Sequence, residues 1–182
     1  MIPLLLAACA TSSTPAYDMT GPLPTESLYH LDVDLVDQHG NDVGLDVHRG
    51  HPTIISMFYA SCPMACPMLI EDAKAFEAEL SPEAREGARV LLVSLDPDRD
   101  SPDVLAGVVR THALDDARWT LTRAELSDVR LVAAALDVRF RPLPDGEMNH
   151  SSILIALDRD GVPRASVEGL RQDTSPLREV FE

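Results

Sequence analysis

The chain has 182 residues, enough for one globular domain with a short appendage, and 45% of them are hydrophobic, enough for a core. Thirty acidic residues against 15 lysines and arginines give a net charge of −15, which repels phosphate backbones and anionic lipid surfaces. Aromatic residues make up only 4%, so stacking platforms for single-stranded nucleic acid are not expected either. We therefore expect no nucleic-acid partner and no direct membrane binding by the domain.

The first nine residues, MIPLLLAAC, are apolar and end in small residues, but they are too short to span a bilayer. They look like the tail of a secretory signal, and residues 6–9 resemble the bacterial lipobox, whose cysteine is lipidated and becomes the first mature residue. The alternative is a frayed hydrophobic tail in which Cys9 is incidental. We expect Cys9 to be lipidated, which would anchor the domain to the membrane on the periplasmic side of a bacterial cell envelope, where disulfides can form.

Residues 10–27 are rich in Ser, Thr and Pro, which predicts an extended tether, and residues 28–182 are then the folded domain. At its start, residues 28–37 alternate between apolar and polar side chains, as a half-buried strand does. A turn signal at 38–42 and a second segment over 43–50 follow, so we expect an N-terminal β-hairpin.

The rest of the domain alternates between expected strands and helices. In chain order, these are a buried strand over 52–60, a helix over 67–80, a buried strand over 88–96, a helix over 101–114, a short strand over 118–122, a helix over 124–138, a strand over 150–158, a returning strand over 162–169 and a final helix over 175–182. Asp160 and Gly161 supply the turn between the last two strands. This order predicts an α/β fold, a thioredoxin-like central sheet flanked by helices, with the N-terminal hairpin as an extension.

Two cysteines, Cys62 and Cys66, lie between the first buried strand and the helix that follows it. Pro67 disfavours α geometry at Cys66, so we expect the helix to begin at Pro67 and Cys66 to lie near its N-cap. Free N–H groups at a helix start favour a thiolate, and two thiolates at this spacing can bind a soft metal or close a disulfide. The alternative is two buried structural cysteines, although the flanking prolines make them poor core residues.

Three segments together resemble the Sco/SenC family: CPMACP at 62–67, SLDPDRDSP at 94–102 and NHSSILIALDRDG at 149–161. These proteins are thioredoxin-fold, copper-binding factors used in assembling cytochrome c oxidase. The resemblance covers residues 28–182 and implies that Cys62, Cys66 and His150 bind copper, as Cu(I), Cu(II) or both. Without it, His150 would be interpreted as a surface histidine at the junction of a loop and a strand.

The donor types agree with copper. Thiolates suit soft Cu(I), and imidazole suits both copper oxidation states. A structural zinc site usually has four Cys or His ligands, and the sequence has no second pair of closely spaced cysteines to complete one. The remaining histidines are expected to be structural or solvated: His30, His39, His48, His51 and His112.

The acidic segment at 96–100 alternates aspartates as a calcium loop does, but it lacks the glycine and the closing glutamate of such a loop. A turn in which Ser101 caps the next helix at Pro102 explains it better. In the family this segment lies near the copper site, so the resemblance implies that Asp96 or Asp98 orients His150 or the nearby loops.

Methionines also surround the cysteines. A brief thioether contact with copper is conceivable for Met57, Met64 and Met68, but core packing for Met57 and loop filling for Met64 are the simpler interpretations. Two positions depart from the family pattern. Met64 and Ala65 stand where an acidic or hydroxyl residue is frequent, and Asn149 precedes His150 where Asp is common.

Two functions follow from these residues. The first is a metallochaperone that delivers copper to the copper-bearing subunit of cytochrome c oxidase or to another cuproprotein. The second is an enzyme, a thiol–disulfide oxidoreductase that keeps a client's cysteines reduced, with Cys62 as the more exposed sulfur and Cys66 as the resolving one. A thioredoxin-like reductant would then serve as a further partner. The distant His150 favours copper, and both roles can coexist because they use the same sulfurs.

Overall fold

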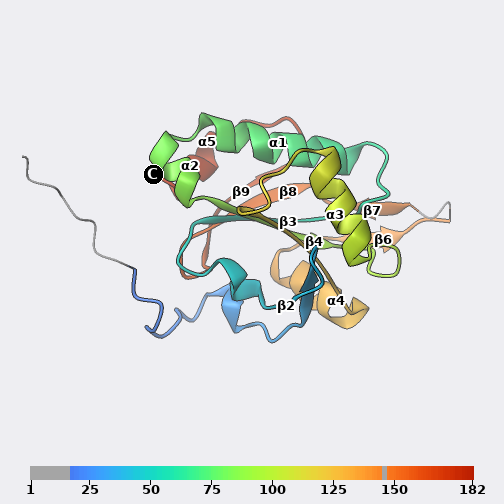
Figure 1. The fold of residues 1–182 in the computed structure, drawn as a ribbon, viewed down its shortest axis with the longest axis horizontal. Coiled ribbons are helices and arrows are strands. Elements are labelled where there is room, and N and C mark those ends of the chain that lie inside the picture. The colour runs from blue at the N-terminus through green and yellow to red at the C-terminus, as the bar shows by residue number, and fades with distance from the viewer. Residues whose placement is uncertain (1–16, 145–146) are drawn as a thin grey trace, which may run out of the picture.

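A seven-stranded mixed sheet forms the centre of the computed structural model, which describes residues 17–144 and 147–182 (Figure 1). The strands lie in the order β2-β1-β5-β4-β3-β8-β9. Their bounds are β1 Leu35–Asp37, β2 Asp42–Val43, β3 Thr53–Phe58, β4 Arg89–Ser94, β5 Trp119–Ala124, β8 Ile153–Leu157 and β9 Pro163–Glu168. Strands β3, β4 and β5 run parallel, while β8 is antiparallel to β3 and β9 to β8.

Helices cover both faces of this sheet, which explains the continuous apolar runs of its central strands. All six residues of β3 are buried, and so are five of the six in β4. The helices are α1 Ala65–Glu79, α2 Pro82–Gly87, α3 Pro102–Thr111, α4 Leu126–Ala135 and α5 Ser175–Arg178. Buried side chains of α1, α3 and α5 form one core, and those of α4 form a second core on the opposite face. The predicted α/β fold with a central sheet flanked by helices is therefore confirmed.

The N-terminal hairpin exists, but it is shorter than predicted. Only β1 and β2 pair, and β1 also pairs with β5, so the hairpin continues the main sheet. The flanking segments Leu28–His30 and Leu45–His48 are short 3-10 helices. The Ser27 side chain accepts a hydrogen bond from the N–H of Tyr29, a local bond that competes with strand pairing.

The last part of the predicted tether lies against the domain. The Tyr17 hydroxyl donates a hydrogen bond to the Asp160 carboxylate, and Arg49 donates to the carbonyl oxygen of Gly21 at 2.6 Å. The rest of that segment and the signal-like start of the chain lie outside the described residues. Among the helices in 17–144 and 147–182, none is long and apolar enough to cross a membrane.

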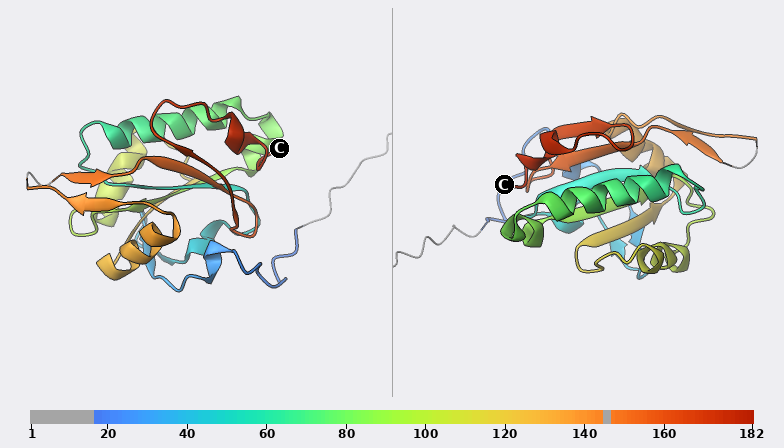
Figure 2. Two further views of the ribbon diagram at one scale, coloured as in Figure 1. Left: turned by 180° about the vertical axis from the view of Figure 1, so that it is seen from behind. Right: turned by 90° about the horizontal axis from the view of Figure 1, so that it is seen from above.

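The segment that precedes β8 is not a single loop, although the sequence analysis placed a loop there. It contains a small separate hairpin, β6 Phe140–Pro142 paired with β7 Met148–His150. His150 therefore ends β7 rather than starting β8, which begins three residues later at Ile153. Three-residue strands are too short to show a clear period in the sequence, so this hairpin could not be recognised there. Figure 2 shows β6 and β7 projecting at the end of the molecule where the chain enters α1.

One helix begins earlier than predicted, and another was not predicted. Helix α1 begins at Ala65, two residues before Pro67, because a residue in the first turn needs no N–H of its own. Helix α2 was not predicted, although its signals are local: the Ser81 side chain caps the N–H of Ala84, and Pro82 occupies the first turn. The expected Ser101 cap is confirmed, since its side chain accepts from the N–H of Val104.

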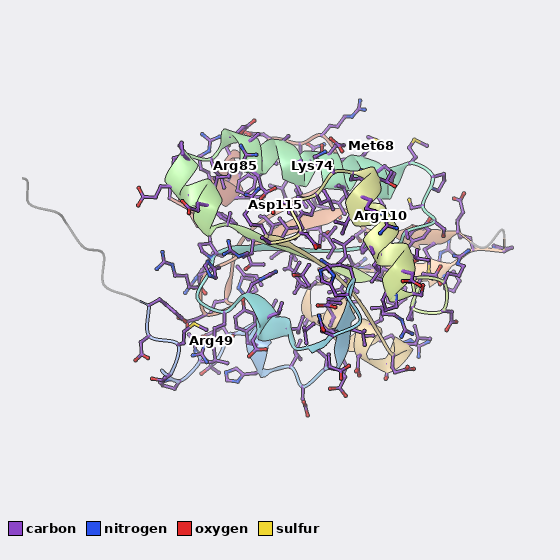
Figure 3. The ribbon with its side chains drawn as sticks, viewed as in Figure 1. Arg49, Met68, Lys74, Arg85, Arg110 and Asp115 are labelled. Atoms are coloured by element: carbon purple, nitrogen blue, oxygen red, sulfur yellow. The ribbon has the colours of Figure 1, made fainter. Side chains whose placement is uncertain are left out.

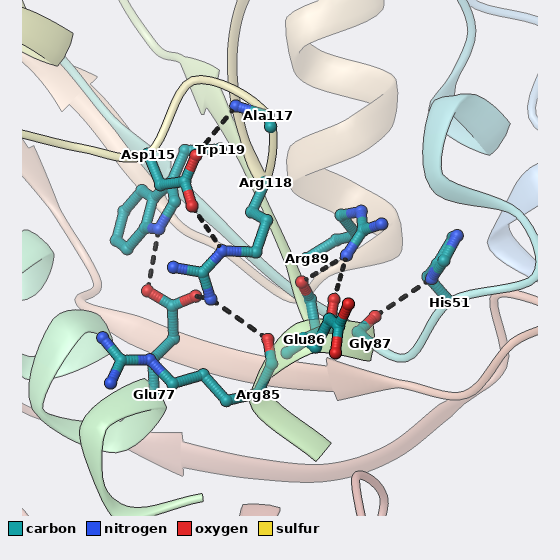
Figure 4. A network of polar contacts seen from close by, with 11 residues as sticks. His51, Glu77, Arg85, Glu86, Gly87, Arg89, Asp115, Ala117, Arg118 and Trp119 are labelled. Carbon is teal, nitrogen blue, oxygen red and sulfur yellow. Dashed lines mark hydrogen bonds and ion pairs between the residues drawn. The ribbon is translucent and has the colours of Figure 1, made fainter. Parts of the chain in front are cut away.

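A polar network around the buried Glu77 holds the far end of α1 on the sheet (Figure 4). The Glu77 carboxylate accepts a hydrogen bond from the Trp119 indole at 2.8 Å and one from Arg118 at 3.0 Å. Arg118 also donates to the Asp115 carboxylate at 2.7 Å and to the carbonyl oxygen of Arg85 at 3.0 Å. The helix that carries Cys66 is thereby tied to β5 and its approach loop.

Candidate metal centre

Cys62, Cys66 and His150 meet at the carboxyl end of β3. Cys62 lies in the loop after this strand, Cys66 in the first turn of α1, and His150 at the end of β7. One ligand atom from each residue lies within 4.8 Å of the other two, and Cys66 Sγ lies 3.7 Å from His150 Nε2. The part of the chain that the structure describes holds no second such group of three or more Cys, His, Asp or Glu side chains. The fold thus brings together the three residues that the sequence proposed as ligands.

Backbone N–H groups point at both sulfurs. The N–H of Cys66 donates to Cys62 Sγ, and the N–H of Tyr59 donates to Cys66 Sγ, each at 3.3 Å. The first bond uses one of the four N–H groups that a helix start leaves free. The loop between β3 and α1 therefore folds back on itself and holds the two sulfurs next to each other.

The two thiols differ in acidity. Burial acts to raise the pKa of the Cys62 thiol, but hydrogen bonds from the N–H groups of Cys66 and Met64 and from the Tyr59 side chain hold it below its ordinary value. Burial raises the pKa of the Cys66 thiol, and the nearby charges of Cys62 and Asp100 add to that rise. Cys62 is also the more exposed of the two, at 8% against 2%. Cys62 is therefore the sulfur that ionises and meets solvent first.

His150 presents a lone pair to the sulfurs. Its Nδ1 lies 2.9 Å from the carbonyl oxygen of Ser151. A carbonyl can only accept, so Nδ1 carries the proton and Nε2 is left free to bind a metal. Burial lowers the pKa of this imidazole, which favours the neutral form that a metal needs.

Tyr59 connects the loop that carries Cys62 to the strand that carries His150. The sequence analysis did not single out this residue. Its ring packs edge-on against the His150 ring, with centroids 5.7 Å apart at 80°. Its hydroxyl accepts a hydrogen bond from the N–H of Met148 at 3.3 Å and also bonds the Cys62 side chain. No local signal marks it, because Thr53 and Ser56 place other hydroxyl groups in the same apolar segment.

The acidic segment contributes a different aspartate from those proposed. Asp96 pairs with Arg99, and Asp98 is exposed, so an orienting role for these two remains a prediction. Asp100 is 1% exposed, and its carboxylate accepts from the N–H of Ala60 at 3.0 Å and from the Ser94 hydroxyl at 2.5 Å. It therefore ties the loop that carries Cys62 to the end of β4.

A groove of about 350 Å³ opens beside Cys62 and His150. Its lining is largely apolar and consists of Tyr59, Cys62, Pro63, Met64, Ala65, Met68, Glu147, Met148, Asn149, His150 and Leu170. Met68 lies near the N-terminal end of α1, and Lys74 lies further along the same helix (Figure 3). Met57, by contrast, is fully buried in the core on the α4 side of the sheet, as expected. Cys9 lies outside the described residues, so its lipidation remains a prediction.

Two sulfurs and one imidazole nitrogen form a donor set that is suited to a soft metal ion at low coordination number. Both cysteines are free thiols in the structure. The same arrangement also allows thiol–disulfide exchange, because an acidic, more exposed thiol lies next to a buried partner.

Comparisons with known proteins agree with this geometry. The sequence profile of the family described as SCO1/SenC matches residues 24–180. A protein of Stutzerimonas stutzeri, provisionally named a copper-binding protein, is 23% identical over 175 residues, which cover 90% of this chain and 84% of that protein.

Two solved structures are similar in fold. Copper-bound yeast Sco1 has a TM-score of 0.67 at 21% identity, covering 81% of this chain and 82% of the yeast chain. The second structure is BsSco, which is described as a member of the Sco family of cytochrome c oxidase assembly proteins with a disulfide switch. It has a TM-score of 0.66 at 19% identity, and the match covers 84% of this chain and 90% of the BsSco chain. At these identities, the similarity establishes the thioredoxin-like fold.

Proposed function

The chain belongs to the SCO1/SenC family, and on that basis we propose that it is a copper metallochaperone in which Cys62, Cys66 and His150 bind the metal. The observation that carries the proposal is the placement of two cysteine sulfurs and a histidine nitrogen within 4.8 Å of one another. The copper-bound relative and the relative named for copper binding support the choice of metal.

The donor chemistry favours copper over zinc. Thiolates prefer Cu(I), and the neutral His150 imidazole suits Cu(I) and Cu(II) alike. Structural zinc sites close with four ligands, whereas this centre gathers three. A three-ligand centre beside an open groove can release its cargo by ligand exchange, which a chaperone requires.

We propose that the recipient is the copper-bearing subunit of cytochrome c oxidase or another cuproprotein. The description of BsSco as belonging to a family of oxidase assembly proteins supports this choice. Lipid attachment at Cys9 would place the domain at the periplasmic membrane surface, and this localisation is proposed from the sequence alone.

The difference between the two thiols favours a second candidate function, thiol–disulfide exchange. In this reaction, the Cys62 thiolate attacks a client disulfide and forms a mixed disulfide, releasing one client thiolate. The Cys66 thiolate then displaces the second client sulfur, so that the client is reduced and Cys62–Cys66 is oxidised. A thioredoxin-like dithiol would supply the two electrons that restore the pair. Hydrogen bonds hold the pKa of the Cys62 thiol below its ordinary value, which supports its role as the attacking sulfur.

The proposal is tested by anaerobic titration of the reduced protein with Cu(I) against a competing chelator. We expect the wild type to bind one equivalent of Cu(I) tightly. The affinity of His150→Ala should be at least about tenfold lower, because removing even a residue that only supports a metal ligand can weaken binding by this factor. His39→Ala is the matched control, because His39 is exposed and pairs with Asp116 instead.

The same variants separate the two functions. We expect His150→Ala to leave dithiol exchange with a small disulfide largely intact, because that reaction uses only the sulfurs. Equal loss of copper binding and exchange in a folded variant would contradict this division of roles. A wild type that does not compete for Cu(I) would leave thiol–disulfide exchange as the function.

A further inference from the structure

We propose that the groove beside Cys62 is a second, weaker copper site, formed by the thioethers of Met64, Met68 and Met148 and specific for Cu(I). Copper enters and leaves the Cys62–Cys66–His150 centre through this methionine site. The inference rests on the proposed copper function and adds the route by which the metal reaches two buried thiols.

The fold gathers three of the six methionines around one opening. Met64 is 67% exposed, while Met68 and Met148 are half-buried, and all three line the groove that Cys62 and His150 also line. Met64 lies between Pro63 and Pro67, and a methionine side chain this exposed gains little from core packing.

The backbone directs these side chains toward one place. Met64 is the N-cap of α1, and the N–H of Met68 in the first turn bonds to its carbonyl oxygen at 3.3 Å, so the two residues lie one turn apart at the start of the helix and both line the groove. Met148 precedes His150 by two residues in β7 and therefore shares its face of the strand. The hydrogen bond from its N–H to the Tyr59 hydroxyl fixes Met148 beside the centre.

Thioether chemistry sets the properties of the site. A thioether is a soft, neutral donor that suits Cu(I) and, unlike a thiol, binds without losing a proton. Thiolates bind Cu(I) more strongly because they are charged. The methionines of the groove therefore form the weaker outer site and the buried cysteines the stronger inner one, so copper gains binding free energy as it moves inward.

The transfer is a ligand exchange without redox change. A bond between Cu(I) and a thioether breaks, and a bond between Cu(I) and Cys62 Sγ forms as the thiol proton passes to solvent. Cys62 is the entry ligand because it lines the groove and is more exposed than Cys66. Release to a recipient follows the same steps in reverse.

The site is tested first in the variant Cys62→Ser/Cys66→Ser, with ¹³C-labelled methionine methyl groups and Ag(I) as a redox-inert probe for Cu(I). We expect Ag(I) to shift the methyl signals of Met64, Met68 and Met148 and to leave the buried Met57 unchanged. Shifts at Met57 or at none of the three would overturn the proposal.

The route is tested by the rate at which a Cu(I)–chelator complex loads the protein with intact cysteines. We expect Met64→Leu/Met68→Leu/Met148→Leu to load at least about tenfold more slowly, while Met57→Leu loads at the wild-type rate. An unchanged loading rate in the folded triple variant would overturn the route. If that variant loaded normally but no longer transferred copper to a recipient protein, the groove would be a docking surface instead.

These outcomes are distinguishable from failure of the proposed function. A wild type that binds no Cu(I) would refute the copper function itself. A wild type that binds one equivalent of Cu(I), together with a Cys62→Ser/Cys66→Ser variant whose three methionine methyl groups do not respond to Ag(I), would refute the methionine site alone.

Discussion

At the residue scale, the centre depends on a tyrosine as well as on its three ligands. The Tyr59 hydroxyl bonds the N–H of Met148 and the Cys62 side chain, and its ring packs on His150. It therefore sets the distance between the loop that carries the sulfurs and the strand that carries the imidazole.

Tyr59→Phe keeps the ring and removes only the hydroxyl. We expect the dissociation constant for Cu(I) to rise about fivefold, the equivalent of one hydrogen bond of about 1 kcal/mol. The Cu(II)–thiolate charge-transfer band should also shift, because Cys62 loses a hydrogen bond. Tyr17→Phe is the control, since the Tyr17 hydroxyl bonds Asp160 instead. Identical affinity and band position in the two variants would contradict a positioning role for Tyr59.

Residues of the centre were predictable to different degrees. The spacing of Cys62 and Cys66 and the neighbouring prolines indicated reactive thiols without any structure. His150 was recognisable only through the family resemblance, because it lies 84 positions after Cys66 in the chain. Tyr59 and Asp100 were missed because their roles consist of tertiary contacts that no local pattern encodes.

At the scale of elements, α1 acts as the support of the centre. Its first turn holds Cys66, and its last turns are fixed by the bonds from Trp119 and Arg118 to the buried Glu77 carboxylate. Burial raises the pKa of Glu77 despite these partners, so the carboxylate bears a desolvation cost that its hydrogen bonds must offset.

Glu77→Ala leaves the Arg118 charge and the Trp119 N–H without their partner. We expect the free energy of unfolding to fall by about 3 kcal/mol, as it does when one member of a buried ion pair is removed. Chemical denaturation of the metal-free protein measures this change.

Glu79→Ala provides the matched comparison in the same helix. The Glu79 carboxylate is exposed and pairs with Arg178 at the surface, so its loss should cost less than about 1 kcal/mol. Equal effects of the two substitutions would contradict the anchoring role of Glu77.

Element prediction succeeded where burial imposes a pattern and failed where strands are short. The continuous apolar segments predicted β3 and β4, and Ser101 was correctly predicted to cap α3. The Ser81 cap was overlooked, and with it the short helix α2. The hairpin of β6 and β7 was not predicted, because each strand has three residues and its place is set by contacts with the centre. This omission matters, since β7 positions His150.

At the scale of the whole molecule, acid stability depends on a buried histidine. His48 is 8% exposed, and its Nε2 has no hydrogen-bond partner. Burial lowers its pKa from 6.5 to about 4, and the nearby positive charges of Arg89 and His51 act in the same direction.

The sign of the pH effect follows from this shift. Between pH 6.5 and about 4, the unfolded chain binds a proton at His48 that the folded chain does not, so the free energy of unfolding falls as the pH falls. The contribution over this range is roughly 3 kcal/mol, at 1.36 kcal/mol per pKa unit. Denaturation at several pH values should show that the free energy of unfolding falls less steeply with decreasing pH in His48→Gln than in wild type. His30→Gln, at an exposed position, should follow wild type, and parallel curves for all three proteins would contradict the assignment.

Two sulfurs and one nitrogen of this chain are proposed to bind copper, and X-ray absorption at the copper edge counts these ligands directly. For protein loaded with one equivalent of Cu(I), we predict two sulfur scatterers and one nitrogen scatterer, with the nitrogen lost in His150→Ala and retained in His39→Ala. A copper ion without sulfur neighbours, or a nitrogen that persists in His150→Ala, would contradict the claim.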